Sequence, residues 1–202
     1  MAVEENQKKK KKEEKLGWKK NMVLYMHDLL YMLVIIMLLF LLVFRVIVVS
    51  GSSMYSTLLD GDYLLLISNL FYNDPQQGDI VVISKESFDN GAPIVKRVIA
   101  TEGQTVDIDF IRGVVYVDGI ALEEPYTYTP TNVDEGTTFP QVIQEGCVFV
   151  LGDNRNKSRD SRSPDIGQID NREILGKALY LFLPGIDEDA DAPDYDRIGA
   201  IK

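Results

Sequence analysis

The sequence has few of the side chains that most often build catalytic and metal sites. It contains one cysteine, Cys147, and one histidine, His27, in 202 residues. A single cysteine excludes an intramolecular disulfide and cannot supply a zinc cluster. A single histidine leaves little room for histidine-based catalysis or for a histidine-rich metal site.

An even distribution of charge is also lacking. Residues 1–20 hold eight lysines and four acids, a net charge of +4, whereas the remaining 182 residues hold 13 basic and 27 acidic side chains, a net charge of −14. Phosphate binding needs a concentrated basic surface, so an acidic body argues against nucleic acid as a partner. The overall net charge of −10 therefore averages a basic start and an acidic domain.

A long apolar run separates these two parts. Leu29 to Phe44 is sixteen apolar residues without a break, and the stretch reaches 21 residues when counted through Arg45 to Val49. As a helix rising ~1.5 Å per residue it is about 31 Å long, which matches a bilayer core of ~30 Å. The lysines lie directly before it, so the positive-inside bias predicts a cytoplasmic N-terminus and an extracytoplasmic domain in the plasma membrane.

Two other interpretations of the apolar run were weighed. A buried core helix is rarely apolar on all faces for so long. A cleaved signal peptide would find small residues at Ser50 and Ser52, but its apolar region is roughly 7–15 residues and its basic start is short. Both limits are exceeded here, which favours a single uncleaved anchor in a lipid bilayer.

The chain beyond the apolar run is predicted to be mainly β, an antiparallel sheet domain without sustained helical periodicity. Turn signals such as Asn90-Gly91 and Gly152-Asp153 separate short runs of Val, Ile, Leu and aromatic residues. Val114 to Leu122, around Asp118-Gly119, is a hairpin candidate because a type I′ turn needs positive φ. The expected strands are residues 63–67, 79–83, 94–100, 106–110, 114–117, 147–151 and 178–183.

These observations predict four segments. They are a basic cytoplasmic segment (1–28), a transmembrane anchor (29–49), an extracytoplasmic β-rich domain (50–184) and an acidic tail (185–202). Residues 123–146, with three prolines, are expected to form a long loop. The tail has six acids within ten residues, which predicts a solvated and poorly ordered segment.

A serine- and glycine-rich stretch, residues 50–58, follows the apolar run. A serine beside a glycine in a tight turn can present both its hydroxyl and a backbone N–H to a substrate carbonyl, which is what acyl transfer requires. Alone the signal is weak, because such linkers commonly follow membrane helices.

A nucleophilic serine needs a base, and His27 lies on the other side of the predicted membrane from Ser53. Lysine is the alternative base known from Ser-Lys variants of the catalytic triad. The lysines beyond the apolar run are Lys85, Lys96, Lys157, Lys177 and Lys202.

Lys96 lies in an expected strand, on one face with Ile94 and Val98. If that face is the core, burial lowers the lysine pKa. Half-neutrality at pH 7 needs a fall of about 3.4 units from ~10.4, within the ~3–5 units known for burial. Periodicity leaves open whether Arg97 points inward instead, and Lys177 between two leucines passes the same test.

A second polar stretch, residues 152–164, follows an expected strand. Its alternating acids, bases and hydroxyls are typical of a polar surface loop. The same residue types also suit a network that orients a catalytic lysine, with Ser158 or Ser161 as a hydrogen-bond partner.

Taken in order, these features resemble the bacterial type I signal peptidases of the single-anchor, Gram-positive kind. The resemblance covers residues 29 to about 183. Its motifs are the anchor, Gly51-Ser52-Ser53-Met54 with Thr57-Leu58, Gly78-Asp79-Ile80-Val81, Val95-Lys96-Arg97-Val98-Ile99, Gly152-Asp153-Asn154-Arg155 leading to Ser158 and Asp160-Ser161-Arg162, and Ile174-Leu175-Gly176-Lys177. No single motif is decisive, whereas the ordered set is highly specific.

The resemblance implies a signal-peptidase-like fold and a role for each matching residue. Ser53 matches the nucleophile and Lys96 the general base; Ser52 is the rival nucleophile. Ser158 matches the serine that hydrogen-bonds the base. The matching ion pairs are Asp160 with Arg162 and Asp153 with Arg97.

Three positions depart from the family pattern. Ser56 replaces the usual proline, and Gly51 stands where some relatives have a serine that helps bind the oxyanion. Glu102-Gly103-Gln104 replaces the more usual Pro-Gly-Asp. None of these changes removes a reacting group, and with Gly51 the oxyanion would rely on backbone N–H groups, chiefly that of Ser53.

The implied activity is removal of signal peptides from exported preproteins that carry small residues at the cleavage site. It proceeds through an acyl-enzyme and needs no metal or cofactor. The alternatives are a non-catalytic membrane-anchored β binding module and a Ser-Lys peptidase dedicated to a narrow substrate set. A relative of the self-cleaving Ser-Lys repressors is a further possibility, but those carry a DNA-binding domain and no membrane anchor.

Overall fold

A computed structural model describes residues 2–187 and 189–201, with side chains from Trp18 onward, and the chain divides after Leu42 into two units. The first unit is helix α1 (Ala2–Val43). Its stretch Trp18–Val43 is 26 residues long with a mean hydropathy of 2.5, and its side chains are not buried by protein. Length and exposed apolar surface are what a membrane-spanning helix requires.

The predicted anchor boundary at Val49 is wrong. The helix ends at Val43, and Phe44–Val48 is strand β1, which pairs antiparallel with β2 (Tyr63–Ser68). Val49 continues this connection, because its N–H donates to the Asp62 carbonyl and its own carbonyl accepts from Gly61. An apolar β-branched sequence suits a strand as well as a membrane helix, so composition alone could not separate them.

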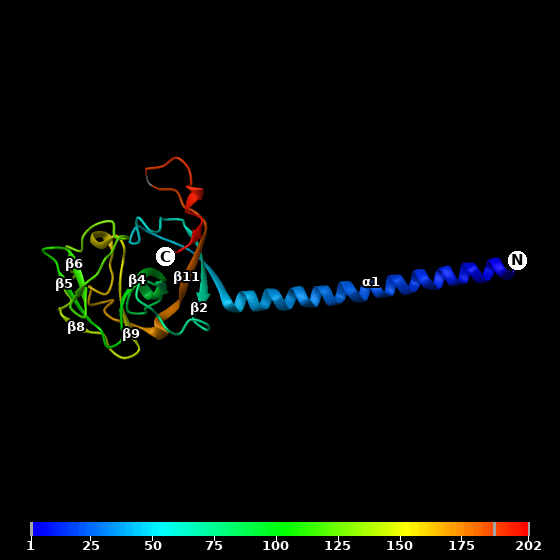
Figure 1. The fold of residues 1–202 in the computed structure, drawn as a ribbon, viewed down its shortest axis with the longest axis horizontal. Coiled ribbons are helices and arrows are strands. Elements are labelled where there is room, and N and C mark those ends of the chain that lie inside the picture. Colours follow the sequence, from blue (N-terminus) through cyan, green and yellow to red (C-terminus); the bar gives the residue numbers. More distant parts are fainter. Residues whose placement is uncertain (1, 188, 202) are drawn as a thin grey trace. The chain divides into compact units, whose positions relative to one another are not determined.

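The second unit is built on two antiparallel sheets, so the predicted mainly β architecture is confirmed (Figure 1). The larger sheet has the order β1-β2-β11-β3-β4-β9-β10, and β12 pairs with β11. The strands not yet given are β3 (Ile80–Ile83), β4 (Ile94–Thr101), β9 (Cys147–Leu151), β10 (Ile169–Asp170), β11 (Ile174–Leu183) and β12 (Gly199–Ala200).

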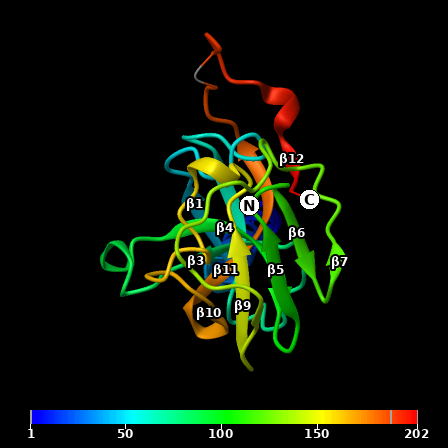
Figure 2. The ribbon, with the colours of Figure 1, turned by 90° about the vertical axis from the view of Figure 1, so that its left-hand side faces the viewer.

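The smaller sheet has the order β7-β6-β5-β8 and lies beside β9 (Figure 2). It consists of β5 (Thr105–Asp109), β6 (Val114–Val117), β7 (Ile120–Ala121) and β8 (Gln141–Val142). A shared cluster of buried side chains, including Val106, Val115 and Phe149, joins the two sheets. The predicted hairpin is present, and Asp118 and Gly119 at its turn both have positive φ, as a type I′ turn requires.

Between residues 44 and 201 the described helices are four short 3₁₀ turns. They are η1 (Asp89–Gly91), η2 (Arg155–Lys157), η3 (Asn171–Glu173) and η4 (Tyr195–Arg197). Residues 123–146 form the long connection expected from the prolines, with only β8 inside it. This connection packs onto the 152–164 segment and so becomes part of the site region.

The acidic tail, expected to be solvated and poorly ordered, is mostly exposed in its described residues, but its end contacts the domain. Strand β12 pairs with β11, and the Ile201 side chain packs on the core cluster of Met54 and Leu58. The Arg197 guanidinium binds the fully buried Asp62 carboxylate. Six acids dominate the composition of this segment, but one arginine and one isoleucine decide where it lies.

Strand β4 is buried on both faces. One face, with Val98, contributes to a cluster containing Val81 and Val150, while Val95 on the other face joins a cluster containing Met54 and Leu58. A central strand covered on both sides can bury neighbouring charged residues on opposite faces, provided each finds polar partners. This is the setting of the predicted catalytic lysine.

Candidate active site

Ser53 opens a turn of residues 53–57 that follows β1 and is held in place by Asn154. The Asn154 N–H donates to the Ser53 carbonyl at 3.0 Å, and its side-chain amide donates to the Ser52 carbonyl at 3.0 Å. Met54 is buried in the core beneath the turn. Two fixed carbonyls and one buried neighbour leave the Ser53 hydroxyl with a defined direction.

The hydroxyl of Ser53 lies against the amine of Lys96. The Nζ–Oγ distance is 2.8 Å, and Nζ is also 2.9 Å from the Val95 carbonyl oxygen. Lys96 is 3% exposed, and this burial lowers its pKa to about 8, although the charges of Asp160 and Glu135 oppose the shift. A buried amine with a lowered pKa at hydrogen-bond distance from a serine is suited to take its proton.

The sequence left open whether Lys96 or Arg97 points inward, and whether Lys177 could be the base instead of Lys96. Lys96 and Arg97 are both buried, on opposite faces of β4, so neither excludes the other. Lys177 is partly exposed and pairs with the Asp79 carboxylate at 2.6 Å, so it is held as a charged surface group. Lys85 is bound to Glu173, and Lys202 lies outside the described residues.

Arg97 and Asp153 form a buried ion pair beside Lys96. Two guanidinium nitrogens reach the two carboxylate oxygens at 2.9 and 2.7 Å, and the Tyr126 ring lies 3.9 Å from the guanidinium carbon. The Thr57 hydroxyl donates to the same carboxylate at 2.6 Å. Asp153 therefore connects β4, the strand that contains Lys96, to Thr57 at the end of the Ser53 turn.

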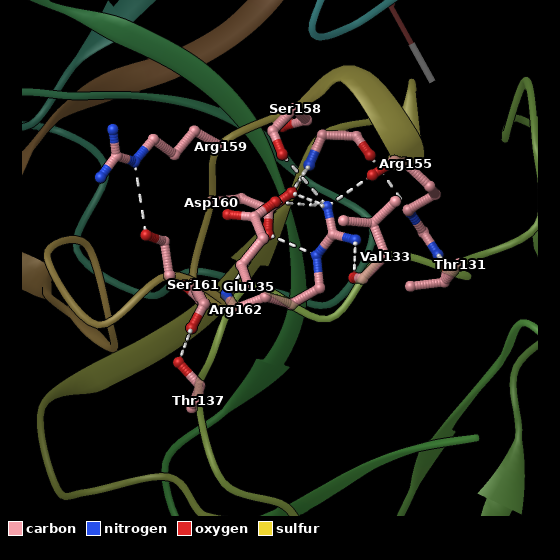
Figure 3. A network of polar contacts seen from close by, with 12 residues as sticks. Thr131, Val133, Glu135, Thr137, Arg155, Ser158, Arg159, Asp160, Ser161 and Arg162 are labelled. Carbon is pink, nitrogen blue, oxygen red and sulfur yellow. Dashed lines mark hydrogen bonds and ion pairs between the residues drawn. The ribbon is translucent and has the colours of Figure 1, made fainter. Parts of the chain in front are cut away.

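Asp160 and Arg162 form a second buried ion pair, with bonds of 2.8 and 2.9 Å, at the centre of the network in Figure 3. The Gly152 N–H donates to Asp160 at 3.0 Å. Arg162 also reaches Glu135, at 3.2 Å, and the Val133 carbonyl, so the long connection is fastened here. Burial, with the charge of Asp160, raises the pKa of Glu135 to about 6.

The structure does not contain the expected hydrogen bond from Ser158 to Lys96. Ser158 is 5% exposed, and its hydroxyl oxygen has no hydrogen-bond partner among the described residues. The residue packs against Gly152, where an added Cβ would meet the Ser158 hydroxyl at 2.1 Å and the Ser53 carbonyl at 2.5 Å. Ser158 is thus in the predicted neighbourhood without making the predicted contact.

Gly51 lies directly before Ser52 with φ +85°, a conformation that L side chains rarely adopt. Its N–H donates to the Asp60 carboxylate at 2.7 Å. The glycine that departs from the serine of some relatives is therefore required by the backbone of this turn. No hydrogen bond from the Ser53 N–H is formed within the part of the chain that the structure describes.

A cavity of about 390 Å³ opens beside Ser53 and Lys96. Apolar side chains form most of its wall, and Ser53 and Lys96 form its polar side. The lining residues are Ile47, Val48, Ser50, Ser53, Pro93, Ile94, Val95 and Lys96. Strand β1, which the sequence suggested to be membrane anchor, thus contributes a wall of the candidate active site.

Several residues of the site region were not singled out from the sequence. Asn154 and Thr57 stood inside the quoted motifs without a role, and Glu135 and Asp62 stood outside them. The polar run Gly152-Asp153-Asn154-Arg155 directly after a buried strand was the one local signal for Asn154. Glu135 pairs with Arg162, 27 residues later in the sequence, and Asp62 pairs with Arg197, 135 residues later. No local sequence pattern indicates contacts over such separations.

Comparison with known proteins agrees with this geometry. Residues 22–183 match the family model described as "Signal peptidase, peptidase S26". The chain belongs to this family. It is 38% identical over 144 residues to a "Probable signal peptidase I-1" of Synechocystis sp., covering 67% of this chain and 69% of that protein. It is 34% identical over 145 residues to "Signal peptidase I T" of Bacillus subtilis, covering 68% and 72%.

A solved signal peptidase I from Enterococcus faecalis V583 is also similar, with 30% identity, 52% of this chain and 96% of that chain covered, and a TM-score of 0.42. Because the chain belongs to the signal peptidase family, it is a serine endopeptidase that removes signal peptides. The binding-module alternative is thereby set aside in favour of an enzyme.

Proposed function

We propose that this signal peptidase cleaves exported preproteins with Ser53 as the nucleophile and Lys96 as the general base. The observation that carries the proposal is the 2.8 Å contact between the Ser53 hydroxyl and the Lys96 amine, buried at the edge of an apolar cavity. A serine and a base at hydrogen-bond distance are the signature of an activated nucleophile.

In this mechanism neutral Lys96 takes the proton of Ser53 as Oγ attacks the scissile carbonyl. The tetrahedral intermediate collapses when Lys96 returns that proton to the leaving amine, and an ester to Ser53 remains. A water molecule, deprotonated by the same amine, then attacks the ester, and the proton passes back to Oγ. One base therefore serves both half-reactions.

The oxyanion of each intermediate would be bound by the Ser53 N–H, which has no partner in the described chain. The turn places this donor because Asn154 fixes the carbonyls of Ser52 and Ser53. Gly51 offers no side-chain donor, so the backbone supplies the stabilisation.

The 390 Å³ cavity is the proposed binding site for the signal-peptide residues before the scissile bond. Its wall of Ile47, Val48 and Val95 favours small apolar side chains, which matches substrates with small residues at the cleavage site. Helix α1 would cross the plasma membrane with the lysine-rich N-terminus in the cytoplasm, which leaves the catalytic domain on the export side.

The test is cleavage of a panel of preproteins by Ser53→Ala and Lys96→Ala in the full chain. Each variant is expected to lose processing of every precursor while its circular dichroism spectrum stays that of the wild type. Ser52→Ala is the matched control, since this exposed neighbour makes no contact with Lys96 in the described structure, and it should remain active. Normal cleavage by Ser53→Ala would overturn the assignment.

A further inference from the structure

The described part of the last segment lies beyond residue 183, where the match to the family ends, and it is fastened to the catalytic domain. Strand β12 pairs antiparallel with β11, the Ile201 N–H donates to the Leu179 carbonyl, and the Ile201 side chain packs on the core cluster. Residues 189–201 are called the C-terminal strap below.

Arg197 is the polar anchor of the strap. Its two terminal nitrogens reach the Asp62 carboxylate oxygens at 2.9 and 2.6 Å, and one of them also lies 3.4 Å from the Thr57 carbonyl oxygen. Asp62 is fully buried, and Arg197 is partly buried, with 19% of its side chain exposed. A buried carboxylate needs such a partner, because an unpaired charge at this position would be costly.

Asp62 in turn fixes the chain that leaves the nucleophile turn. Its carboxylate accepts from the Leu59 N–H at 2.8 Å and from the Gly185 N–H at 2.7 Å. The Asp62 carbonyl accepts from the Val49 N–H at 2.8 Å, at the point where the chain enters the same turn. Asp62 therefore binds both ends of the segment that carries Ser53, one through its carboxylate and the other through its main-chain carbonyl.

The far side of this segment is tied to the base strand. Thr57 binds Asp153 through its hydroxyl, and Asp153 pairs with Arg97, the residue after Lys96. On the other side of Thr57, the Arg197 guanidinium donates to the Thr57 carbonyl oxygen. Thr57 thus lies between the strap and the strand that carries the base.

We propose that Arg197 is a positioning residue for catalysis: through Asp62 and Thr57, the C-terminal strap holds the Ser53 turn at the distance that reaction with Lys96 requires. The inference rests on the proposed roles of Ser53 and Lys96. Arg197 touches neither the 390 Å³ cavity nor the reacting atoms, so its effect belongs to the chemical step rather than to substrate binding.

The experiment compares Arg197→Ala and Arg197→Lys with the wild type on one purified preprotein. Arg197→Ala is expected to lower kcat by about tenfold or more, because displacement of reacting groups by an ångström costs up to about a hundredfold. KM should change less than about twofold. Arg197→Lys keeps the charge without the two-pronged geometry and should recover part of kcat.

Hydrogen exchange followed by mass spectrometry shows where the chain loosens, while the fall in kcat at nearly constant KM is the readout that a merely structural role would not produce. In Arg197→Ala, amides of residues 57–62 should exchange faster while those of β9 keep their protection. The matched control is Arg172→Ala, which removes an arginine with the same two-pronged contact to Asp170 on an exposed surface, and it should leave kcat unchanged.

Wild-type kcat in Arg197→Ala, or a loss of activity explained entirely by global unfolding, would overturn the proposal. Ser53→Ala is assayed alongside. Activity in Ser53→Ala would reject the catalytic assignment itself, whereas inactive Ser53→Ala with fully active Arg197→Ala would reject only the role of the strap.

Discussion

As the proposed general base, Lys96 has to be buried enough to lose its proton and still be surrounded by partners that keep the fold stable. Burial lowers its pKa, while Asp160, Glu135 and Asp153 raise it, and the balance is a value of about 8. At pH 7 roughly one molecule in ten would then carry the neutral amine in the free enzyme. The acidic neighbours therefore limit how far burial lowers the pKa of Lys96.

The pH dependence of activity follows from this balance. Only neutral Lys96 can accept the serine proton, so kcat/KM should fall as pH decreases through about 8. The measurement is initial-rate cleavage of a preprotein between pH 6 and 10. A profile that stays flat through this range would contradict a lysine base with a pKa near 8.

Glu135 gives a way to move that profile. With a pKa of about 6 it is ionised at pH 8, where its negative charge favours protonated Lys96. Glu135→Gln removes the charge and keeps a side chain of similar shape, so the acid limb should shift to lower pH. Glu145→Gln, at an exposed position of the same connection, is the control and should leave the limb in place. A limb that shifts upward in Glu135→Gln would refute the electrostatic coupling.

At the scale of elements, local sequence was sufficient to predict strands that combine alternating apolar residues with flanking turn residues. The β6–β7 hairpin and the central strands β4 and β9 were predicted within one residue of their bounds, because alternation and turn residues are local signals. Strand β1 was not, since Phe44–Val48 is as apolar as the helix before it and only its pairing with β2 defines it as a strand.

The site shows the same division. The order of the motifs brought Ser53, Lys96 and both ion pairs into one prediction, and they do lie together in the structure. The contacts of Glu135 and Arg197 depend on how distant segments pack, which no spacing reveals. The absent Ser158 bond shows that a matching position does not specify a rotamer.

Gly152, between β9 and η2, is a junction with no room for a side chain. An added Cβ would lie 2.1 Å from the Ser158 hydroxyl and 2.5 Å from the Ser53 carbonyl, so the chain behind the nucleophile must move. Gly152→Ala is expected to destabilise the domain by about 1–3 kcal/mol and to lower kcat strongly.

The measurement is thermal unfolding together with preprotein cleavage. Gly199→Ala in β12 is the control, because a Cβ there has no neighbour within 4 Å and the backbone is not in the positive-φ region. Equal stability and activity of Gly152→Ala and wild type would show that the contact is relieved without consequence.

At the scale of the whole molecule, the basic residues precede the apolar stretch in the sequence and most of the acidic residues follow it. Eight lysines lie in residues 1–20, whereas the chain after residue 20 carries a net charge of −14. The lysines beside the membrane helix bias its insertion strongly, whereas the acids of the domain contribute little to topology. The lysines alone should therefore determine on which side the catalytic domain lies.

Replacing all eight lysines of residues 1–20 with glutamine should reduce the fraction of chains whose catalytic domain is exported. The measurement is digestion of residues 44–202 by an added protease in intact bacterial protoplasts, compared with lysed ones. An all-arginine variant keeps the charge and should keep the wild-type orientation. Because the proposed nucleophile Ser53 would meet preproteins only where they emerge, the glutamine variant should also process precursors more slowly in cells while its detergent-solubilised activity is unchanged. Unaltered protease exposure in the glutamine variant would mean that the folded domain, rather than the lysine block, directs insertion.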